Sequence, residues 1–277
     1  MGLLLDEVRK HRANREVWVS ILVCCLFNGI SLMTLRADLR PLPDEFTWQY
    51  WYHIQQDIHS FGAMTMAILL TVSLPRIFCC EIELRTDRLV RTSAHGCRKV
   101  WTAKMLYAVL YCTTVVFVLC TITLLADGSA FGFRGALSPV TDSMYWSADG
   151  LPPMSNLAYC ILQYGFLLLG SLYYAGFVML ISILTRRTAL SIFICGGIWT
   201  LLYGYGLREF NPFLVSSLDT VFCYSFGSFM DQSGFSYAFA GEDPVWANLW
   251  KPILFVLFMI AAEVGLSWLI WRRRAKK

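Results

Sequence analysis

The residues of this chain that could carry out chemistry are few, and their spacing argues against most kinds of catalysis. His53, Asp57 and His59 could suggest a metal site, but on a helix His59 lies about 240° around the axis from His53. The ten cysteines contain no C-x-x-C pair of the kind that binds zinc. No serine or paired-carboxylate arrangement suggests an intramembrane protease. We therefore predict no metal site and no enzyme activity in this chain.

The strongest pattern of charged residues is a polar segment, residues 79–104, between two apolar runs. From Glu81 to Lys104 it carries six Lys or Arg side chains, together with the acids Glu81, Glu83 and Asp87. A segment of this kind stays in water beside a membrane, where it either rests on lipid phosphates or docks onto a protein. The acids weaken binding to anionic lipid and can pair with a protein partner, so the mixture of charges favours docking.

A short helix is predicted inside the polar segment, over residues 87–94. The preceding apolar run should stop or kink at Pro75, because proline disrupts a continuing helix. Thr86 is a candidate N-cap, and Asp87 suits the positive end of the helix dipole. Gly96 is expected to end the short helix.

The elements that position these residues must be membrane helices. The chain is 57% hydrophobic and only 15% charged, against about 25% charged residues in soluble domains. Apolar runs of about 20 residues predict helices, which satisfy their own backbone hydrogen bonds in lipid. We predict an all-α polytopic membrane protein, with residues 1–277 as a single transmembrane domain. The expected spans are 17–35, 58–78, 105–126, 157–184, 189–207 and 252–271, and the expected extracytoplasmic loops are 36–57, 127–156 and 208–251.

The distribution of basic residues predicts the orientation in the membrane. Eighteen of the 23 Lys and Arg residues fall on one side of these spans and five on the other. The positive-inside rule places the richer side, with both termini, in the cytoplasm. Residues 3–16 are expected to form an amphipathic interfacial helix, with Leu4, Leu5 and Val8 on one face and the charges on the other. The expected location is the cytoplasmic membrane of a bacterium.

This topology and the polar segment together resemble the type-2 ABC transporter permease family. Members have six spans, cytoplasmic termini and an interfacial helix before the first span. After the second span they carry an acid, a threonine, a short leucine-rich helix, a Ser/Thr step, a basic residue and a lysine that opens the third span. The matching positions are Glu81 or Glu83, Thr86, Leu89, Val90, Thr92, Ser93, Arg98 and Lys104. The chain departs from the family pattern at Arg85, where glycine is usual, and at Ala94-His95, where proline is common.

The resemblance implies that the polar segment is a coupling helix that docks onto a separate cytoplasmic ATPase. Two ATPase subunits would bind ATP and Mg, since this chain has no G-x-x-x-x-G-K-[ST] phosphate loop. A second permease subunit, identical or similar, would complete an exporter in membrane lipid, with no cofactor in this chain and no nucleic-acid partner. The residues expected to couple to the ATPase are Glu81, Glu83, Thr86, Asp87, Arg88, Leu89, Arg91, Thr92, Arg98 and Lys104.

Polar residues inside the spans are the candidates for contact with cargo. Glu263 is the only carboxylate deep in an apolar run, where an ionisable group costs about 2.5–3.5 kcal/mol on insertion scales. It is either a contact for a proton, a cation or cargo, or a structural hydrogen-bonding group. In the family the second and fifth spans line the path, so the other candidates are Thr65, Met66, Thr71, Thr200 and Tyr203. Taken singly, polar residues in spans often only join helices.

The small number of charges in the spans predicts an apolar or amphipathic cargo: a peptide, a lipid-like compound or a drug. Two other functional classes stay open at this point. One is a membrane assembly or sensory subunit that moves no cargo. The other is an intramembrane enzyme, which the lack of a catalytic arrangement disfavours. Co-purification with an ATPase separates the transporter from both.

Overall fold

The computed structural model describes residues 2–12, 15–38, 49–86, 96–140, 154–203, 225–231 and 250–275. These residues are mostly helical and contain no β-strand, although Pro139 and Ser155 form an isolated β-bridge. In chain order the helices are α1 (Gly2–Arg12), α2 (Arg15–Asp38), α3 (Gln49–Ser73), α4 (Pro75–Glu83), α6 (Gly96–Phe131), α7 (Asn156–Thr185), α8 (Thr188–Tyr203), α11 (Phe226–Asp231) and α13 (Trp250–Ala275).

Four helical segments are long and apolar enough to cross a membrane. They are Phe61–Glu83, which joins α3 to α4, Cys97–Ser129 in α6, Asn156–Thr185 in α7, and Ile253–Arg274 in α13. Shorter apolar stretches, Val17–Leu26 and Thr188–Leu201, lie in α2 and α8. The prediction that the chain is helical is thereby confirmed for the described residues, and the four segments agree with a multi-pass membrane protein, while the count of six spans stays a prediction.

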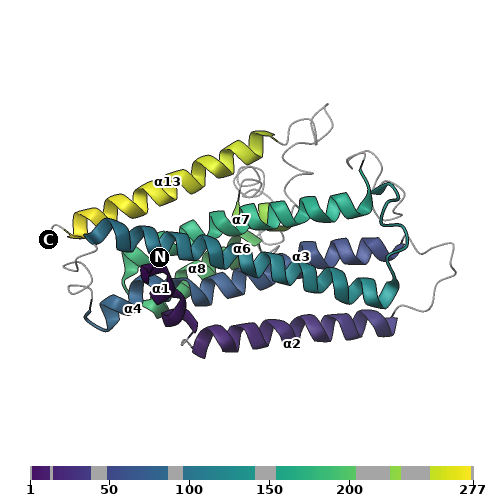
Figure 1. Ribbon diagram of the computed structural model, residues 1–277, viewed down its shortest axis with the longest axis horizontal. Coiled ribbons are helices and arrows are strands. Elements are labelled where there is room, and N and C mark those ends of the chain that lie inside the picture. Colours follow the sequence, from purple (N-terminus) through teal and green to yellow (C-terminus); the bar gives the residue numbers. More distant parts are fainter. Residues whose placement is uncertain are drawn as a thin grey trace, which may run out of the picture.

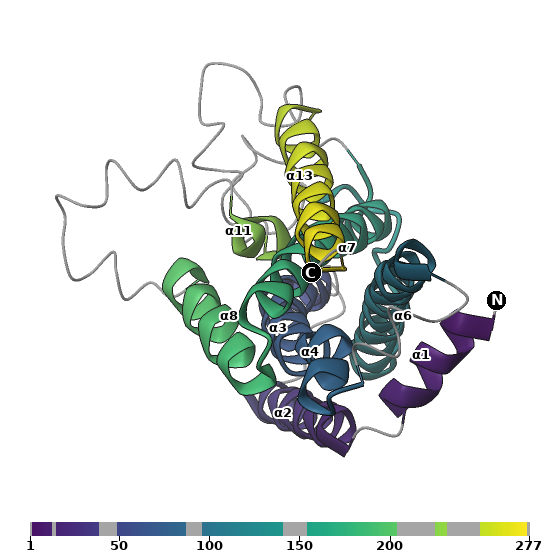
Figure 2. The ribbon, with the colours of Figure 1, turned by 90° about the vertical axis from the view of Figure 1, so that its left-hand side faces the viewer.

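The long helices run side by side along the longest axis of the molecule (Figure 1). Helices α1 and α4 and the C-terminal end of α13 lie together at one end of this bundle, which we call the α4 end (Figures 1 and 2). Seen from the α4 end, α3 lies in the middle of the bundle (Figure 2) and contacts α2, α6, α7 and α8. The central position explains why α3 is the most buried of the apolar segments.

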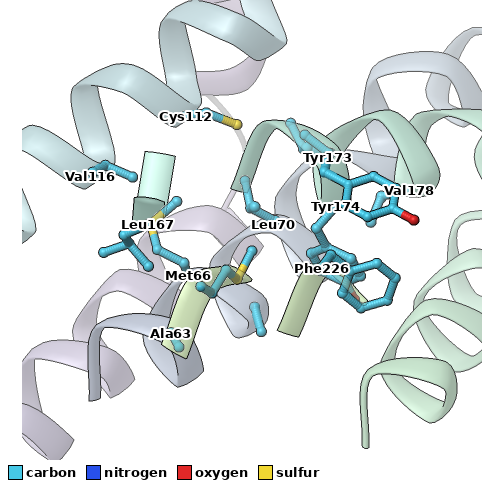
Figure 3. Close-up of a cluster of buried hydrophobic side chains, with 14 of the residues drawn as sticks. Ala63, Met66, Leu70, Cys112, Val116, Leu167, Tyr173, Tyr174, Val178 and Phe226 are labelled. Atoms are coloured by element: carbon cyan, nitrogen blue, oxygen red, sulfur yellow. The ribbon is translucent and has the colours of Figure 1, made fainter. Parts of the chain in front are cut away.

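The core forms mainly between α3 and α7. Met66 and Leu70 of α3 are fully buried and lie near Leu167 and Tyr174 of α7 (Figure 3). The short helix α11 packs against α7, where a Cβ on Gly170 would lie 2.8 Å from the backbone nitrogen of Met230. Only glycine allows so close an approach of the two helices.

The helices near the polar segment are longer than the sequence predicted. Helix α3 begins at Gln49, so residues 49–57 are helical rather than part of a loop. The predicted stop or kink at Pro75 is confirmed: α3 ends at Ser73 and the chain restarts at Pro75 as α4, where the missing N–H of proline is not needed. Helix α6 begins at Gly96, well before the apolar run. Helices can continue into water because their backbone hydrogen bonds are internal.

Candidate functional site

The α4 end contains a buried ion pair that joins the two sides of the polar segment. Glu81, in the last turn of α4, and Lys104, in α6, are 2.9 Å apart between Oε1 and Nζ. Their side chains are 7% and 1% exposed. Lys104 also donates a 2.6 Å hydrogen bond to the carbonyl oxygen of Ile77 and lies 5.5 Å from the centre of the Phe78 ring. Both residues were predicted to couple to the ATPase, and the structure places both facing inward.

Helix α1 completes an ion cluster of four side chains: Glu7, Lys10, Glu81 and Lys104. Lys104 Nζ lies 3.4 Å from Glu7 Oε1. Lys10 Nζ lies 2.9 Å from Glu7 and 3.1 Å from Glu81. Two carboxylates and two ammonium groups therefore alternate, so the ion cluster carries no net charge while it ties α1 to α4 and α6.

The four charged side chains can be buried because each carboxylate is paired with an ammonium group. Removing one partner of a buried pair typically costs about 3–5 kcal/mol, because a charge is left without compensation. Burial alone would lower the pKa of Lys10, but the hydrogen bond and charge of Glu7, followed by those of Glu81, raise it above its usual value. Lys10 therefore stays charged at neutral pH. The ion cluster therefore stabilises the packing of three helices, α1, α4 and α6.

The distribution of exposed and buried residues around α1 differs from the prediction. Leu5 and Val8 are exposed, as expected for an interfacial helix, but Glu7 points into the protein and is only 7% exposed. The charges of α1 are therefore not all on its polar face, as predicted. The reason is tertiary: Lys104 needs counter-charges, and α1 supplies one of them.

Glu83, at the end of α4, binds the first residue of α8. Its Oε1 accepts a 2.7 Å hydrogen bond from the backbone N–H of Thr188, and its Oε2 accepts a 3.1 Å bond from the Thr188 hydroxyl. A carboxylate at a helix N-terminus satisfies a free N–H and is favoured by the helix dipole. Glu83 therefore couples α4 to α8 within the chain.

Thr86 follows α4 and bonds back to its last turn, whereas the short helix predicted over residues 87–94 lies outside the described residues. Its backbone N–H and its hydroxyl both lie within hydrogen-bond distance of the Glu81 carbonyl oxygen, at 2.8 and 3.3 Å, and Arg85 takes a left-handed φ of 57°. The other predicted coupling residues in this stretch, namely Asp87, Arg88, Leu89, Arg91 and Thr92, lie outside the described residues. Arg98 is exposed in the first turn of α6.

Further contacts at the α4 end join α13 to its neighbours. The Trp271 indole donates a 3.2 Å hydrogen bond to the Cys97 carbonyl, and its ring meets the Phe78 ring edge-on at 5.3 Å. Arg274 donates to the carbonyl of Ile183, near the end of α7. Helices α1, α4, α6, α7, α8 and α13 are thus connected at one end of the bundle.

The residues predicted to line a cargo path do not converge on one cavity. Met66 is in the core, and the hydroxyls of Thr71 and Tyr174 share a 2.6 Å hydrogen bond. Thr200 is exposed on α8, and its hydroxyl bonds the Gly196 carbonyl of its own helix. Tyr203 ends α8, and its side chain lies outside the described part.

Thr65 faces an apolar groove between α2, α3 and α6. The groove has a volume of about 440 Å³, within the range of small-molecule sites. Phe61, Val118 and Ile122 also line it, and the carboxyl group of Asp57 lies at one end. No cation among the described residues pairs with Asp57. The groove therefore combines a largely apolar lining with one acidic group.

Glu263 lies between α13 and α7, away from the apolar groove. It is 6% exposed, and its Oε2 has no hydrogen-bond partner among the described residues. Its side chain packs against the backbone of Gly176, where an added Cβ would overlap the carboxyl oxygen. The glycine makes room for the carboxyl group at a helix–helix contact.

Sequence reasoning overlooked three residues at the α4 end: Glu7, Lys10 and Thr188. One signal was available for the first two. Lys104 opens an apolar run, so it had to find counter-charges, and α1 is the nearest interfacial element with an acid on it. Nothing in the sequence indicated that Glu83 would reach Thr188, which is 105 residues away.

Comparison with models of known protein families finds no match to this chain, and comparison with curated proteins finds none either. The family resemblance therefore rests on the topology and the residues that carry it. The geometry of the α4 end is the independent observation that bears on function.

Proposed function

We propose that this chain is the membrane-spanning permease subunit of an ATP-binding cassette exporter. In this proposal α2 and α8 are membrane spans in addition to the four long segments, and the α4 end and both termini lie in the cytoplasm. Two separate ATPase subunits and a second permease subunit, identical or similar, complete the transporter in a bacterial cytoplasmic membrane. Its cargo is an apolar or amphipathic compound.

The ion cluster is the observation that carries the proposal. Residues 84–95 connect α4 to α6, and Glu81 and Lys104 form a salt bridge across the base of this connection. A force applied to residues 84–95 by a docked ATPase would therefore move α4 and α6 as one unit. Glu7 and Lys10 carry the same movement to α1. An ion cluster that holds three helices together could transmit the ATP-driven approach of the two ATPase subunits to the membrane helices.

The bond between Glu83 and Thr188 supports a second route of transmission. Because Glu83 holds the N-terminus of α8, a displacement of α4 also pulls on α8. Helix α8 packs against α3 and α7 in the centre of the bundle. Movement at the α4 end can thus change the packing of the helices that the family resemblance assigns to the cargo path.

The apolar groove supports the proposed class of cargo. Its lining is mostly hydrocarbon, with Thr65 and Asp57 as polar groups on α3. Such a surface favours the chain of an amphiphile and disfavours a strongly hydrated solute, because a hydrated solute would lose its water without compensation. Leu22 of α2 and Phe117 of α6, beside groove-lining residues in the sequence, are exposed apolar side chains of the kind that face lipid.

Affinity purification of the full chain from its native membranes tests the proposal. We expect an ATPase polypeptide to co-purify and the complex to hydrolyse ATP. Reversing Arg88 and Arg91 to Glu should abolish both results without changing membrane insertion. Reversing Arg273, which is exposed near the end of α13, is the control and should change neither. If no ATP hydrolysis accompanies the wild-type chain, it is a non-transporting assembly or sensory subunit.

A further inference from the structure

A second pocket lies between α6 and α13, close to the α4 end. Its volume is about 630 Å³. Arg98 and Trp101 line it from α6, while Trp268 and Arg272 line it from α13, with Val264 and Gly265 completing the wall. None of these lining residues is acidic. The pocket is therefore positively charged at one end and apolar at the other.

The two arginines of this pocket have no charged partner among the residues that the structure describes. Both are exposed, and neither forms an ion pair or side-chain hydrogen bond with the described residues. Arg274 behaves differently, since it donates to the Ile183 carbonyl. Lys104 is likewise fully paired, with Glu7 and Glu81. Two unpaired guanidinium groups beside one pocket indicate a site for an anion.

The tryptophans place the pocket at the depth of lipid headgroups. The Trp101 and Trp268 rings lie 5.2 Å apart, and tryptophan is enriched where a span meets the membrane surface. Trp101 Nε1 is buried and donates to no described residue. An indole N–H without a partner is unusual, because buried donors are nearly always satisfied. An acceptor in the pocket would meet this need after a small rotation of the ring.

The surface beyond the pocket is hydrocarbon. Leu106 and Val109 of α6 are exposed, as are Leu266 and Leu269 of α13. Leu266 and Leu269 belong to the same stretch of α13 as the pocket residues, and Leu106 and Val109 follow Trp101 along α6. A free phosphate ion would use only the arginines, whereas a phospholipid would use the arginines, the tryptophans and this apolar surface together.

We propose that the pocket between α6 and α13 binds one anionic phospholipid. Arg98 and Arg272 hold its phosphate, because a planar guanidinium group makes paired hydrogen bonds to phosphate oxygens. Its acyl chains lie along Leu106 and Leu269. Bound there, the lipid connects α13 to the first two turns of α6, which belong to the polar segment. This binding does not depend on the proposed transport function.

Native mass spectrometry of the purified full chain in a neutral detergent tests this proposal. The probe is palmitoyl-oleoyl phosphatidylglycerol, compared with the same lipid carrying a phosphatidylcholine headgroup. We expect one phosphatidylglycerol to bind more tightly than phosphatidylcholine. Arg98→Gln and Arg272→Gln should each weaken it about fivefold, and the double variant about 25-fold, as expected for the loss of one and two basic residues near an anionic headgroup.

Two further variants distinguish binding in this pocket from nonspecific attraction between the anionic lipid and nearby basic residues. Arg273→Gln removes an exposed charge next to Arg272 that does not line the pocket, and it should change affinity by less than about twofold. Trp101→Phe keeps the ring but removes the N–H, and it should weaken phosphatidylglycerol binding. All variants should show the same elution volume and thermal unfolding as the wild type.

Three results would overturn the proposal. The first is a double variant that keeps wild-type affinity for phosphatidylglycerol, and the second is an Arg273→Gln variant that loses as much affinity as the pocket variants. The third is complete displacement of phosphatidylglycerol by millimolar inorganic phosphate, which would show that the pocket recognises free phosphate. Equal affinity for both lipids would show that the headgroup charge is not recognised, and would also count against it.

Discussion

Glu81 and Glu263 are both helical carboxylates, and both are nearly buried, with 5% and 6% of their surface exposed. They differ in what surrounds them. Glu81 lies between the ammonium groups of Lys10 and Lys104. Glu263 packs against the backbone of Gly176 and forms no ion pair with the described residues. The Oε2 atom of each carboxylate has no hydrogen-bond partner there, so the ion pairs are what distinguish Glu81.

The comparison shows that a buried carboxylate in this protein can be either paired with cations or left without one. At the α4 end each charged side chain is paired with one of opposite charge, so the ion cluster stabilises the contact between α1, α4 and α6. At the α7–α13 contact a carboxyl without a cation is costly in its ionised form. The first carboxylate is best tested by removing its partners, and the second by removing its ability to ionise.

The largest expected effect comes from Lys104→Met, which keeps the length of the side chain but removes its charge. Glu7 and Glu81 would then face each other with only the half-exposed Lys10 between them. We expect a loss of about 3–5 kcal/mol in the free energy of unfolding, measured in mixed detergent micelles. Lys99→Met, at an exposed position of the same helix, should cost less than about 0.5 kcal/mol. Equal stability of the two variants would contradict the structural role of the ion cluster.

Gly176→Ala should have the next largest effect, because the new Cβ would overlap the Glu263 carboxyl oxygen. Overpacking of this kind costs about 1–3 kcal/mol. The same unfolding assay measures it, with Gly197→Ala as control, since a Cβ there meets nothing within 4 Å. Combining Gly176→Ala with Glu263→Ala should recover much of the loss. Without that recovery, the contact between the two residues is not the cause.

Glu83→Ala tests the contact between α4 and α8. It removes the carboxylate that accepts both hydrogen bonds from Thr188. Loss of a helix cap typically costs about 0.5–2 kcal/mol, and we expect about 1 kcal/mol here. Asp6→Ala, at an exposed acid whose nearest cation is 3.9 Å away, is the control and should be close to neutral. An equal effect of the two variants would show that the Thr188 bonds add nothing.

Glu263→Gln should have a smaller effect, below about 1 kcal/mol, because Gln keeps the shape of the side chain and cannot ionise. A much larger loss would show that the ionised form is stabilised by a partner, as it is for Glu81. If stability is kept while cargo-stimulated ATP hydrolysis falls, Glu263 contacts a proton, a cation or cargo. If assembly and transport both stay intact, Glu263 contacts neither a proton or cation nor cargo.

The last prediction concerns the pH dependence of stability and rests on Asp57, a carboxyl group that, like Glu263, has no described cation beside it. Burial raises its pKa from 3.8 to about 6, and the other titratable groups that line the groove are the thiols of Cys24 and Cys25. An acid with a raised pKa in the folded state stabilises the fold at low pH. This contribution is lost as the pH rises from about 4 to 6. The stability of Asp57→Asn relative to the wild type should therefore increase over that pH range, and a flat difference would contradict this.

Several spans could be predicted closely from the sequence. Helix α7 occupies residues Asn156–Thr185 against a predicted 157–184, and α13 occupies Trp250–Ala275 against 252–271. The helical start of α3 at residues 49–57 was missed, because its aromatic and polar residues contain no apolar run. The start of α6 was missed because its charges resemble those of a loop.

The candidate site could be predicted only in part. Glu81, Glu83 and Lys104 were identified as important, but as residues that face a partner protein. Their charges indicated an aqueous position and could not show that each would find a partner within the chain. Glu7 lies 97 residues from Lys104 and Glu83 lies 105 residues from Thr188, so neither contact has a local signal.

The sequence by itself determined that this protein is a bundle of membrane helices. Hydrophobicity over about 20 residues is a local property, and in lipid it leaves the backbone only the helix. The tertiary structure alone decided which charges are paired inside the protein and which face outward. Lys104 and Arg98 lie six positions apart on α6, yet the first is buried between two carboxylates and the second is exposed. The packing of α1 against one side of α6, and the contacts of Lys104 with Ile77 and Glu81 of α4, make that difference.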